Sequence, residues 1–228
     1  MTRELRAIVF DFDGVILESV GIKTNAFRDL LPGDRTLQDR MEQYHLQHLG
    51  MSRYEKFSWM YRELLCRPLP PQEMAALDAR FSTAIAAQMR SCPFVTGAAE
   101  FLRAHAESEP LYVASGTPEQ ELRSIVADRG LAPLFKGVYG SPTTKAQVLA
   151  QVWHDVGGPP EGVWFIGDSR QDADAARAVG VTFVARVTPN GDSFGDVPAF
   201  RVAELEELER RLPEIARRRS TPSDVHPR

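Results

Sequence analysis

The chain has few cysteines: its 228 residues include two, Cys66 and Cys92. They do not form a CxxC pair, which excludes a disulfide framework and a zinc site built from cysteines. Such sparse cysteine usage is typical of a reducing compartment. We therefore expect a cytoplasmic protein.

Long apolar runs are also missing. No run approaches the roughly 20 apolar residues that a helix needs to cross a bilayer. The N-terminus opens with Thr2, Arg3 and Glu4 and continues into a short apolar segment, a pattern unlike that of a signal peptide. We expect no membrane partner and no export.

The chain has no excess of positive charge. Its 27 Lys and Arg residues stand against 31 Asp and Glu, a formal net charge of -4. Nucleic-acid binding without sequence preference needs a basic surface, so nucleic acid is not an expected partner. Lysine itself is rare, so a lysine at a special position is more informative than an arginine; the four are Lys23, Lys56, Lys136 and Lys145.

Short apolar runs alternate with amphipathic segments. With 43% apolar and 25% charged residues the composition is globular. Four apolar runs predict buried strands, at 5–10, 110–115, 162–167 and 181–186, and helical patterns cover 118–129, 143–156 and 170–179. Alternation of this kind predicts an α/β fold, a Rossmann-like doubly wound parallel sheet with helices on both faces.

One region breaks the alternation. From about Ser19 to Met89 there is no convincing strand, whereas 52–65 and 71–89 have helical patterns. We therefore expect a core domain from 1–17 and 93–213 with an inserted all-helical unit at 18–92. Residues 214–228 contain three consecutive arginines and two prolines and are expected to form a flexible tail; a basic recognition tail is the alternative.

Polar side chains gather where the predicted strands end. In open parallel sheets the ligand crevice lies beyond the carboxyl ends of the strands. Any one of these residues alone is usual in a turn or a helix cap. Together they predict one site at one edge of the sheet, made of Asp11, Asp13, Ser115, Gly116, Lys145, Asp168 and Asp172.

Such a site needs a cation. Crowded carboxylates repel one another and stay ionised only when positive charge neutralises them. Oxygen ligands with no His or Cys nearby favour Mg²⁺ as the cofactor. One divalent ion, one lysine, one hydroxyl and several loop amides suit a phosphoryl group, whose transfer depends on positioning and charge neutralisation.

Four segments resemble, in order, the four motifs of the haloacid dehalogenase-like hydrolase superfamily. They are DFDGV at 11–15, ASGT at 114–117, Lys145, and GDSRQD at 167–172. The helical insertion after the first motif resembles the type 1 cap of that superfamily, in its phosphoglycolate phosphatase and β-phosphoglucomutase-like branch. The resemblance spans roughly Leu5 to Arg186.

The resemblance implies a role for each motif residue. Asp11 is expected to attack phosphorus and become an aspartyl phosphate, and Asp13 to act first as general acid and then as general base. Ser115 and Gly116 are expected to bind the phosphoryl oxygens, and Lys145 to offset their charge.

The same resemblance implies the metal ligands. Mg²⁺ is expected to bind Asp168, Asp11 and the main-chain carbonyl of Asp13. Asp172 is expected to act through a metal-bound water or through Lys145.

Several activities occur on this fold, so the residues must discriminate among them. Asp13 argues against a dehalogenase, which needs no acid for its leaving group. A non-catalytic relative would have lost one of the motif residues, and none is lost. We expect a phosphatase acting on a small phosphorylated metabolite, such as a sugar phosphate or phosphoglycolate, in a monomer or weak homodimer.

A phosphomutase of the β-phosphoglucomutase type is the main alternative. GMSR at 50–53 resembles the GVSR segment of that enzyme, which predicts that Arg53 binds a remote anion of the substrate; a solvent-facing arginine is the other interpretation. Departures from the mutase pattern are Lys23 in place of His, Gly167-Asp168 in place of Glu-Asp, and SPTTK around Lys145.

The aromatic and histidine residues of the insertion have simpler explanations. His45 and His48 are expected on a solvated helix face rather than as metal ligands. Phe57, Met60 and Leu64 follow helical spacing and are expected to pack inside the insertion. Trp59 and Tyr61 are expected to pack there too, the alternative being that they line a sugar pocket.

Overall fold

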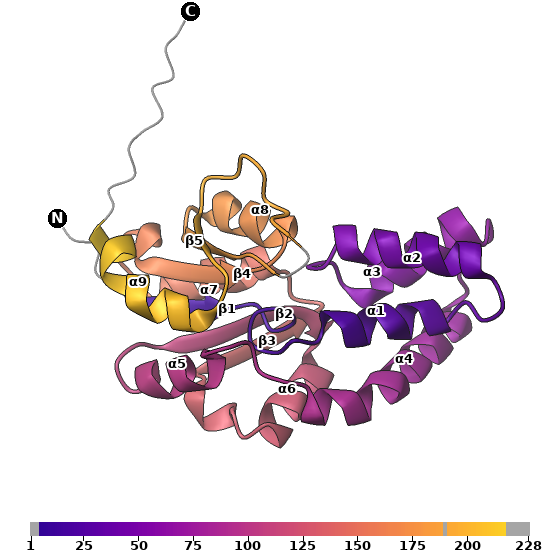
Figure 1. Cartoon of the computed structure of the whole chain (residues 1–228), viewed down its shortest axis with the longest axis horizontal. Coiled ribbons are helices and arrows are strands. Elements are labelled where there is room, and N and C mark those ends of the chain that lie inside the picture. The colour runs from indigo at the N-terminus through magenta and orange to yellow at the C-terminus, as the bar shows by residue number, and fades with distance from the viewer. Residues whose placement is uncertain (1–4, 189–190, 218–228) are drawn as a thin grey trace, which may run out of the picture.

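A six-stranded parallel sheet forms the core of the computed structural model, which describes residues 5–188 and 191–217. Figure 1 shows this sheet between layers of helices. The strand order is β3-β2-β1-β4-β5-β6. The strands are β1 (Ala7–Phe10), β2 (Leu111–Pro118), β3 (Gly137–Ser141), β4 (Val163–Gly167), β5 (Thr182–Arg186) and β6 (Phe200–Val202). Strands β2 and β3 lie on one side of β1, and β4, β5 and β6 lie on the other. The strand order therefore reverses at β1, and a ligand crevice is expected at such a switch point.

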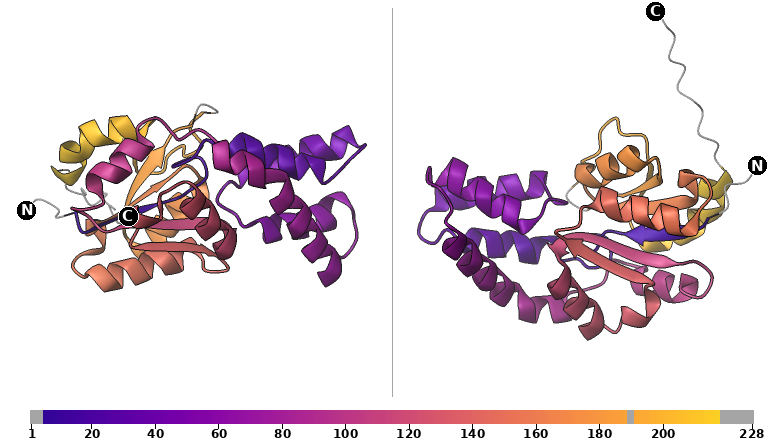
Figure 2. Two further views of the ribbon diagram at one scale, coloured as in Figure 1. Left: turned by 90° about the horizontal axis from the view of Figure 1, so that it is seen from below. Right: turned by 180° about the vertical axis from the view of Figure 1, so that it is seen from behind.

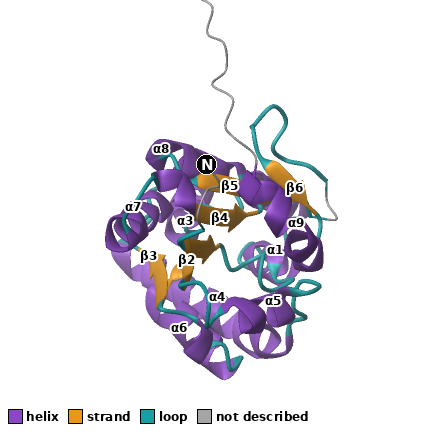
Figure 3. Ribbon diagram, turned by 90° about the vertical axis from the view of Figure 1, so that its left-hand side faces the viewer, coloured by secondary structure: helices purple, strands orange, loops and turns teal. Residues whose placement is uncertain are grey.

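Alternation along β1 separates two apolar layers. Ile8 and Phe10 face one layer, and Ala7 and Val9 face the other. One face packs against α5 (Ala98–His105), α6 (Glu119–Asp128) and α9 (Leu205–Arg217), and the other against α7 (Lys145–Val156) and α8 (Arg170–Val179) (Figure 3). Two 3-10 turns, at Ala132–Leu134 and Pro160–Gly162, complete the connections. The predicted α/β fold is confirmed.

The insertion is all-helical, as predicted, and stands beyond the carboxyl ends of the strands (Figure 2). It contains α1 (Val20–Asp29), α2 (Arg35–Gln47), α3 (Arg53–Trp59), a π-helical segment (Met60–Leu64) and α4 (Pro71–Ser91). Side-chain caps begin two of these helices: Asp34 accepts a hydrogen bond from the Leu37 amide, and Ser52 forms a capping box with Glu55.

The insertion has an aromatic centre. The ring of Phe27 lies 4.5 Å from that of Phe81 and 5.9 Å from that of Phe57, measured between centroids. Phe57, Met60 and Leu64 are buried in the same cluster, as predicted. Trp59 also packs inside the insertion, as predicted, with its ring stacked on that of Tyr44 of α2 at 3.7 Å between centroids.

The prediction of a solvated histidine face is wrong for His45. Its side chain is buried, and its ring centroid lies 4.8 Å from that of Phe27. Met41 and His45 are one helical turn apart on the buried face of α2. The neighbours of His45 in sequence are polar, so the sequence did not indicate that its side chain is buried. His48 is half-buried, and its Nδ1 lies 2.8 Å from the Tyr44 carbonyl oxygen.

The predicted flexible tail begins too early. Helix α9 continues through Pro213 to Arg217, and Ile215 is buried in the core. The apolar side of α9 packs on α5, which holds the helix in place beyond the proline. The remainder of the predicted tail, 218–228, lies outside the described residues. None of the helices in the described ranges is both long and apolar enough to cross a membrane.

Candidate active site

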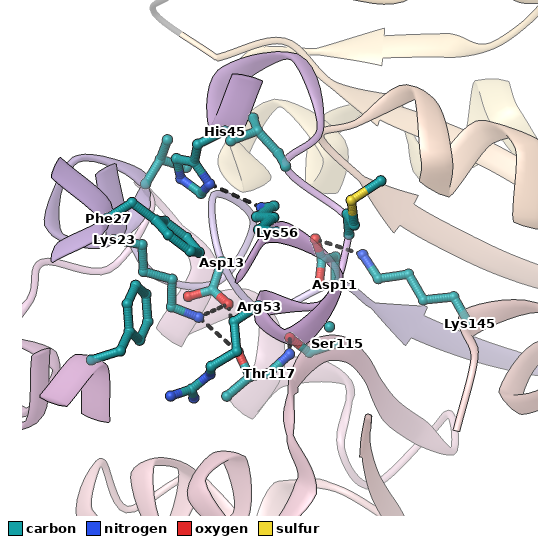
Figure 4. A pocket seen from close by; sticks show the side chains of 15 residues that line it. Asp11, Asp13, Lys23, Phe27, His45, Arg53, Lys56, Ser115, Thr117 and Lys145 are labelled. Atoms are coloured by element: carbon teal, nitrogen blue, oxygen red, sulfur yellow. Dashed lines mark hydrogen bonds and ion pairs between the residues drawn. The ribbon is translucent and has the colours of Figure 1, made fainter. Parts of the chain in front are cut away.

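A pocket lies between the sheet edge and the insertion. The core contributes Asp11, Asp13, Ser115, Gly116, Thr117 and Lys145 to its lining, and the insertion contributes Lys23, Phe27, His45, Arg53 and Lys56, among others (Figure 4). Neither Trp59 nor Tyr61 lines it. The pocket therefore joins the predicted strand-end site to side chains from the insertion.

Asp11 is fixed where β1 ends. Its amide donates to the Ile166 carbonyl at 2.9 Å, and its Oδ1 accepts the Phe12 amide at 2.7 Å. The other carboxylate oxygen lies 3.0 Å from Lys145 Nζ. Both oxygens are thus oriented by the chain before any ligand arrives.

Burial controls the charge of Asp11. It raises the pKa of this carboxyl to about 7; Lys145 opposes the rise, whereas Asp172 and Asp13 add to it. For Lys145, burial lowers the pKa, but Asp11 and Asp172 outweigh burial and the net pKa is raised, so the amine stays protonated. A cation beside Asp11 would keep its carboxylate ionised at neutral pH.

The turn after Asp11 brings a second strand end close. Gly14 has φ +76°, and a Cβ at this position would lie 2.1 Å from Asp168 Oδ2. Only glycine tolerates both the left-handed conformation and this approach. The turn thus sets Asp168 beside the β1 end.

Asp13 lies in different surroundings, although it is two residues from Asp11. Its carboxylate accepts hydrogen bonds from Ser19 Oγ at 2.6 Å, from Thr117 Oγ1 at 3.0 Å and from Lys23 Nζ. Burial acts to raise its pKa, but the charge of Lys23 and these hydrogen bonds together lower it. Asp13 is therefore ionised in the free protein.

Ser115 and Gly116 follow on β2, against the insertion. The buried Ser115 Oγ accepts the Thr117 amide at 3.2 Å. A Cβ on Gly116 would lie 3.1 Å from the Gly50 carbonyl oxygen, and one on Gly50 would lie 2.6 Å from Ser169 Oγ. The 50–51 segment thus lies tightly over the strand ends and covers the pocket.

Three aspartates form a group that fits a hard cation. Carboxylate oxygens of Asp11, Asp168 and Asp172 lie within 4.8 Å of one another. Neither oxygen of the buried Asp168 has a hydrogen-bond partner within the described part of the chain. Burial, with the charges of Asp11 and Asp172, raises its pKa well above the ordinary value. Unpaired buried carboxylates are unfavourable unless a cation binds them, so these oxygens suit Mg²⁺.

Asp172 is already engaged. Its Oδ1 lies 2.5 Å from Lys145 Nζ, and its Oδ2 accepts from Ser169 Oγ at 2.6 Å and from the Ser169 amide at 3.1 Å. Its position as the third residue of α8, in a capping box with Ser169, accounts for these contacts. The geometry makes Asp172 an anchor for Lys145.

Arg53 is buried, not solvent-facing. Its guanidinium forms an ion pair with Glu121 of α6, lies 3.2 Å from Asp78 Oδ1 and donates to Ser82 Oγ at 2.8 Å. Ser82 also donates to Glu121 at 2.6 Å. Sequence reasoning missed Glu121 and Asp78, because nothing local pairs them with Arg53.

Sequence reasoning also missed Lys56. It is buried, and its Nζ lies 2.9 Å from His45 Nδ1 inside the pocket. The scarcity of lysine was the available signal, since Lys23, Lys56 and Lys145 all line this pocket.

This fold, with paired aspartates after β1 and a lysine and a third aspartate at neighbouring strand ends, defines a class of hydrolase. The chain belongs to the haloacid dehalogenase-like hydrolases, whose family profile matches residues 5–180. Among individual proteins, a phosphoglycolate phosphatase of Synechococcus elongatus is 26% identical over 185 residues, 79% of this chain and 83% of that protein.

Two solved structures share the fold. The β-phosphoglucomutase of Clostridium difficile has a TM-score of 0.73 at 14% identity, over 93% of this chain and 97% of that one. The HAD-hydrolase YfnB of Bacillus subtilis, solved bound to magnesium, has a TM-score of 0.66 at 19% identity, over 92% and 99%. At these identities the likeness extends to the fold alone.

Proposed function

We propose that the protein is a Mg²⁺-dependent phosphatase that hydrolyses a small phosphomonoester through an aspartyl phosphate on Asp11. The observation that carries the proposal is the contrast between two neighbouring carboxylates. Asp11 is held by Lys145 and the Phe12 amide beside two further aspartates, whereas Asp13 is held by side chains that donate hydrogen bonds. The surroundings of Asp11 suit a nucleophile, and those of Asp13 suit an acid–base group.

In the first half-reaction Asp11 attacks phosphorus and the alkoxide of the substrate leaves. Lys145, anchored by Asp172, offsets charge on the phosphoryl oxygens, and Ser115 Oγ with the loop amides donates to them. Mg²⁺ bound by Asp11, Asp168 and the Asp13 carbonyl would supply electrostatic stabilisation of this charge. The similarity to the phosphoglycolate phosphatase of Synechococcus elongatus supports this assignment of the reaction.

Asp13 moves the protons. The phosphoryl dianion raises the proton affinity of Asp13 as it approaches, because like charge disfavours ionisation, and this suits donation to the leaving oxygen. After the leaving group departs, the carboxylate held by Lys23 takes a proton from the water that attacks the aspartyl phosphate. The closely packed 50–51 segment limits the access of other water.

The test is phosphate release from p-nitrophenyl phosphate and a panel of small phosphomonoesters. We expect EDTA to abolish release, Mg²⁺ to restore it and Ca²⁺ to inhibit, because Ca²⁺ accepts bidentate carboxylates and disturbs the alignment of Asp11. A phosphatase releases phosphate in proportion to substrate loss. A phosphomutase instead yields an isomerised sugar phosphate, activated by a bisphosphate, and that result would replace the proposed function.

Replacing Asp13 by Asn should separate substrates by their leaving groups. The amide cannot donate the proton that an alkoxide needs, so we expect kcat/KM for alkyl phosphates to fall by about 100-fold or more. A nitrophenolate leaves without a proton and should lose less. Equal losses across a series of phosphate esters ordered by leaving-group pKa would remove Asp13 from the acid role.

A further inference from the structure

Four cationic side chains line the pocket, and three of them are neutralised by carboxylates. Lys23 pairs with Asp13, and Lys145 pairs with Asp11 at 3.0 Å and Asp172 at 2.5 Å. The other two cationic side chains are those of Arg53, which is also neutralised, and Lys56, which is not.

Arg53 carries a full set of partners. Glu121 and Asp78 both lie within ion-pair distance of its guanidinium, which also stacks 4.8 Å from the Phe81 ring centroid. A substrate anion that approached Arg53 would meet two carboxylates as well. Arg53 is therefore a weak receptor for the remote anion that sequence analysis assigned to it.

Lys56 has no carboxylate within ion-pair distance among residues 5–188 and 191–217. Its side chain is 2% exposed, its Nζ lies 2.9 Å from His45 Nδ1, and the Phe27 ring centroid is 5.4 Å away. Figure 4 shows the contact with His45 among the side chains that line the cavity. A protonated lysine has three donors, and here one neutral ring nitrogen takes one of them.

The charge state of this pair follows from burial. Burial, with the charge of Lys56, holds the pKa of His45 well below its ordinary value, so the imidazole is neutral and accepts from the lysine. Burial and the charge of Lys23 lower the pKa of Lys56 to about 7, although Asp13 and Asp168 oppose this. An anion placed against Lys56 would restore its full charge.

We propose that Lys56, oriented by His45, binds a second anionic group of the substrate, a carboxylate or phosphate carried by the leaving group. The inference rests on the proposed function and adds a substrate class to it: phosphomonoesters with a remote anion. Lys56, Asp11 and Ser115 line the same pocket, so the phosphoryl group and the second anion of one substrate would lie in one site. A neutral leaving group offers no counter-charge, so burial would then favour the neutral amine and the site would gain no ion pair.

Matched substrates that differ in one group test this. 2-Phosphoglycolate is compared with 2-hydroxyethyl phosphate, and 3-carboxypropyl phosphate with 4-hydroxybutyl phosphate; the bisphosphates of the same diols distinguish a phosphate from a carboxylate. In wild type we expect kcat/KM for the anionic member of at least one set to exceed its hydroxyl partner by about 10-fold or more. The member of the set with the highest kcat/KM identifies the anion that the site prefers.

Lys56→Met removes the charge and retains an apolar side chain of similar length, so the ratio should fall to about 1, mainly through KM. Lys136→Met is the matched control: Lys136 is exposed ahead of β3, away from the pocket, and the ratio should persist. Lys56→Arg keeps the charge and should retain a preference. If Lys56→Met does not fold, the neutral Lys56→Gln takes its place, with the same expected ratio of about 1. A ratio that survives Lys56→Met, or a wild type that treats each matched set alike, would overturn the proposal.

Failure of the proposed function would be visible separately. If p-nitrophenyl phosphate and the whole substrate panel released no phosphate in Mg²⁺, the phosphatase assignment would fail. The Lys56 inference would then be decided by calorimetry of the same matched pairs on wild type and Lys56→Met in Mg²⁺. Tighter binding of the anionic member, lost in Lys56→Met, supports it; equal binding overturns it.

Discussion

Replacing Asp11 by Asn is expected to lower kcat for phosphate release by more than about 1,000-fold. The amide cannot form the aspartyl phosphate, so the covalent route is closed rather than slowed. The fold should survive, because the side-chain volume is kept, Lys145 retains its ion pair with Asp172, and the carboxylate being removed has a pKa that burial raises to about 7. Phosphate release, circular dichroism and acid-quenched labelling from a radioactive phosphomonoester measure these outcomes.

A matched control removes a carboxylate that is outside the pocket. Asp196 is exposed, and Asp196→Asn makes the same chemical change, so it should retain wild-type turnover and labelling. Activity of Asp11→Asn above about one thousandth of wild type would exclude Asp11 as the nucleophile. Label that persists in this variant would place the phosphoryl group on another residue.

The strand-end residues could be predicted from the sequence because local sequence patterns determine their positions. Asp11 and Asp168 each follow an apolar run that is wholly buried in the sheet, and strands of that kind have ends that meet at one edge. Lys145 begins a helix whose capping box, Thr144 with Gln147, is local in sequence. Short-range patterns and the parallel topology thus suffice to assemble this half of the site.

The other half depends on contacts between distant segments. Strand β3 contains two glycines in five residues, and β6 has three residues, so neither gives a recognisable apolar run. The partners of Arg53 lie 25 and 68 positions away, at Asp78 and Glu121, and no periodicity encodes such a pair. The buried position of the His45 side chain, beside Lys56, likewise depends on packing between distant segments.

The insertion and the core are joined by charge as well as by shape. Arg53 of α3 pairs with Glu121 of α6, and Lys23 of α1 pairs with Asp13 after β1. Both pairs are formed across the pocket by side chains that are largely shielded from water, where breaking one partner costs more than at a surface. The position of the insertion over Asp11 is therefore specified by side chains, and the pocket is covered in the free protein.

Mg²⁺ is expected to stabilise the protein increasingly as pH rises. Burial, with Asp11 and Asp172, raises the pKa of Asp168, so the folded chain without metal holds its proton more tightly than the unfolded chain does. Its free energy of unfolding therefore falls as pH rises above about 4, the unfolded pKa. Mg²⁺ needs the ionised carboxylates, so its binding reverses this loss.

The size of the effect follows from linkage. At a concentration about 100 times its Kd, a ligand that binds only the folded state adds about 2.7 kcal/mol. In a chain of this length that corresponds to a rise in Tm of about 5 to 10 °C, measured by thermal unfolding with and without Mg²⁺ at pH 8. At pH 5 the rise should be much smaller, because protons compete for the same oxygens.

Replacing Asp168 by Asn should separate the destabilising effect of its buried carboxylate from the stabilisation that Mg²⁺ binding provides. The amide removes a buried carboxylate whose two oxygens have no hydrogen-bond partner in the described ranges, so the metal-free variant should unfold at a higher temperature than metal-free wild type at pH 8. It should also lose the response to Mg²⁺ and the phosphatase activity. Asp174→Asn, an exposed change on α8, should behave as wild type in all three measurements. A full Mg²⁺ response in Asp168→Asn would show that the ion binds elsewhere, because no other partnerless carboxylate adjoins Asp11 among residues 5–188 and 191–217.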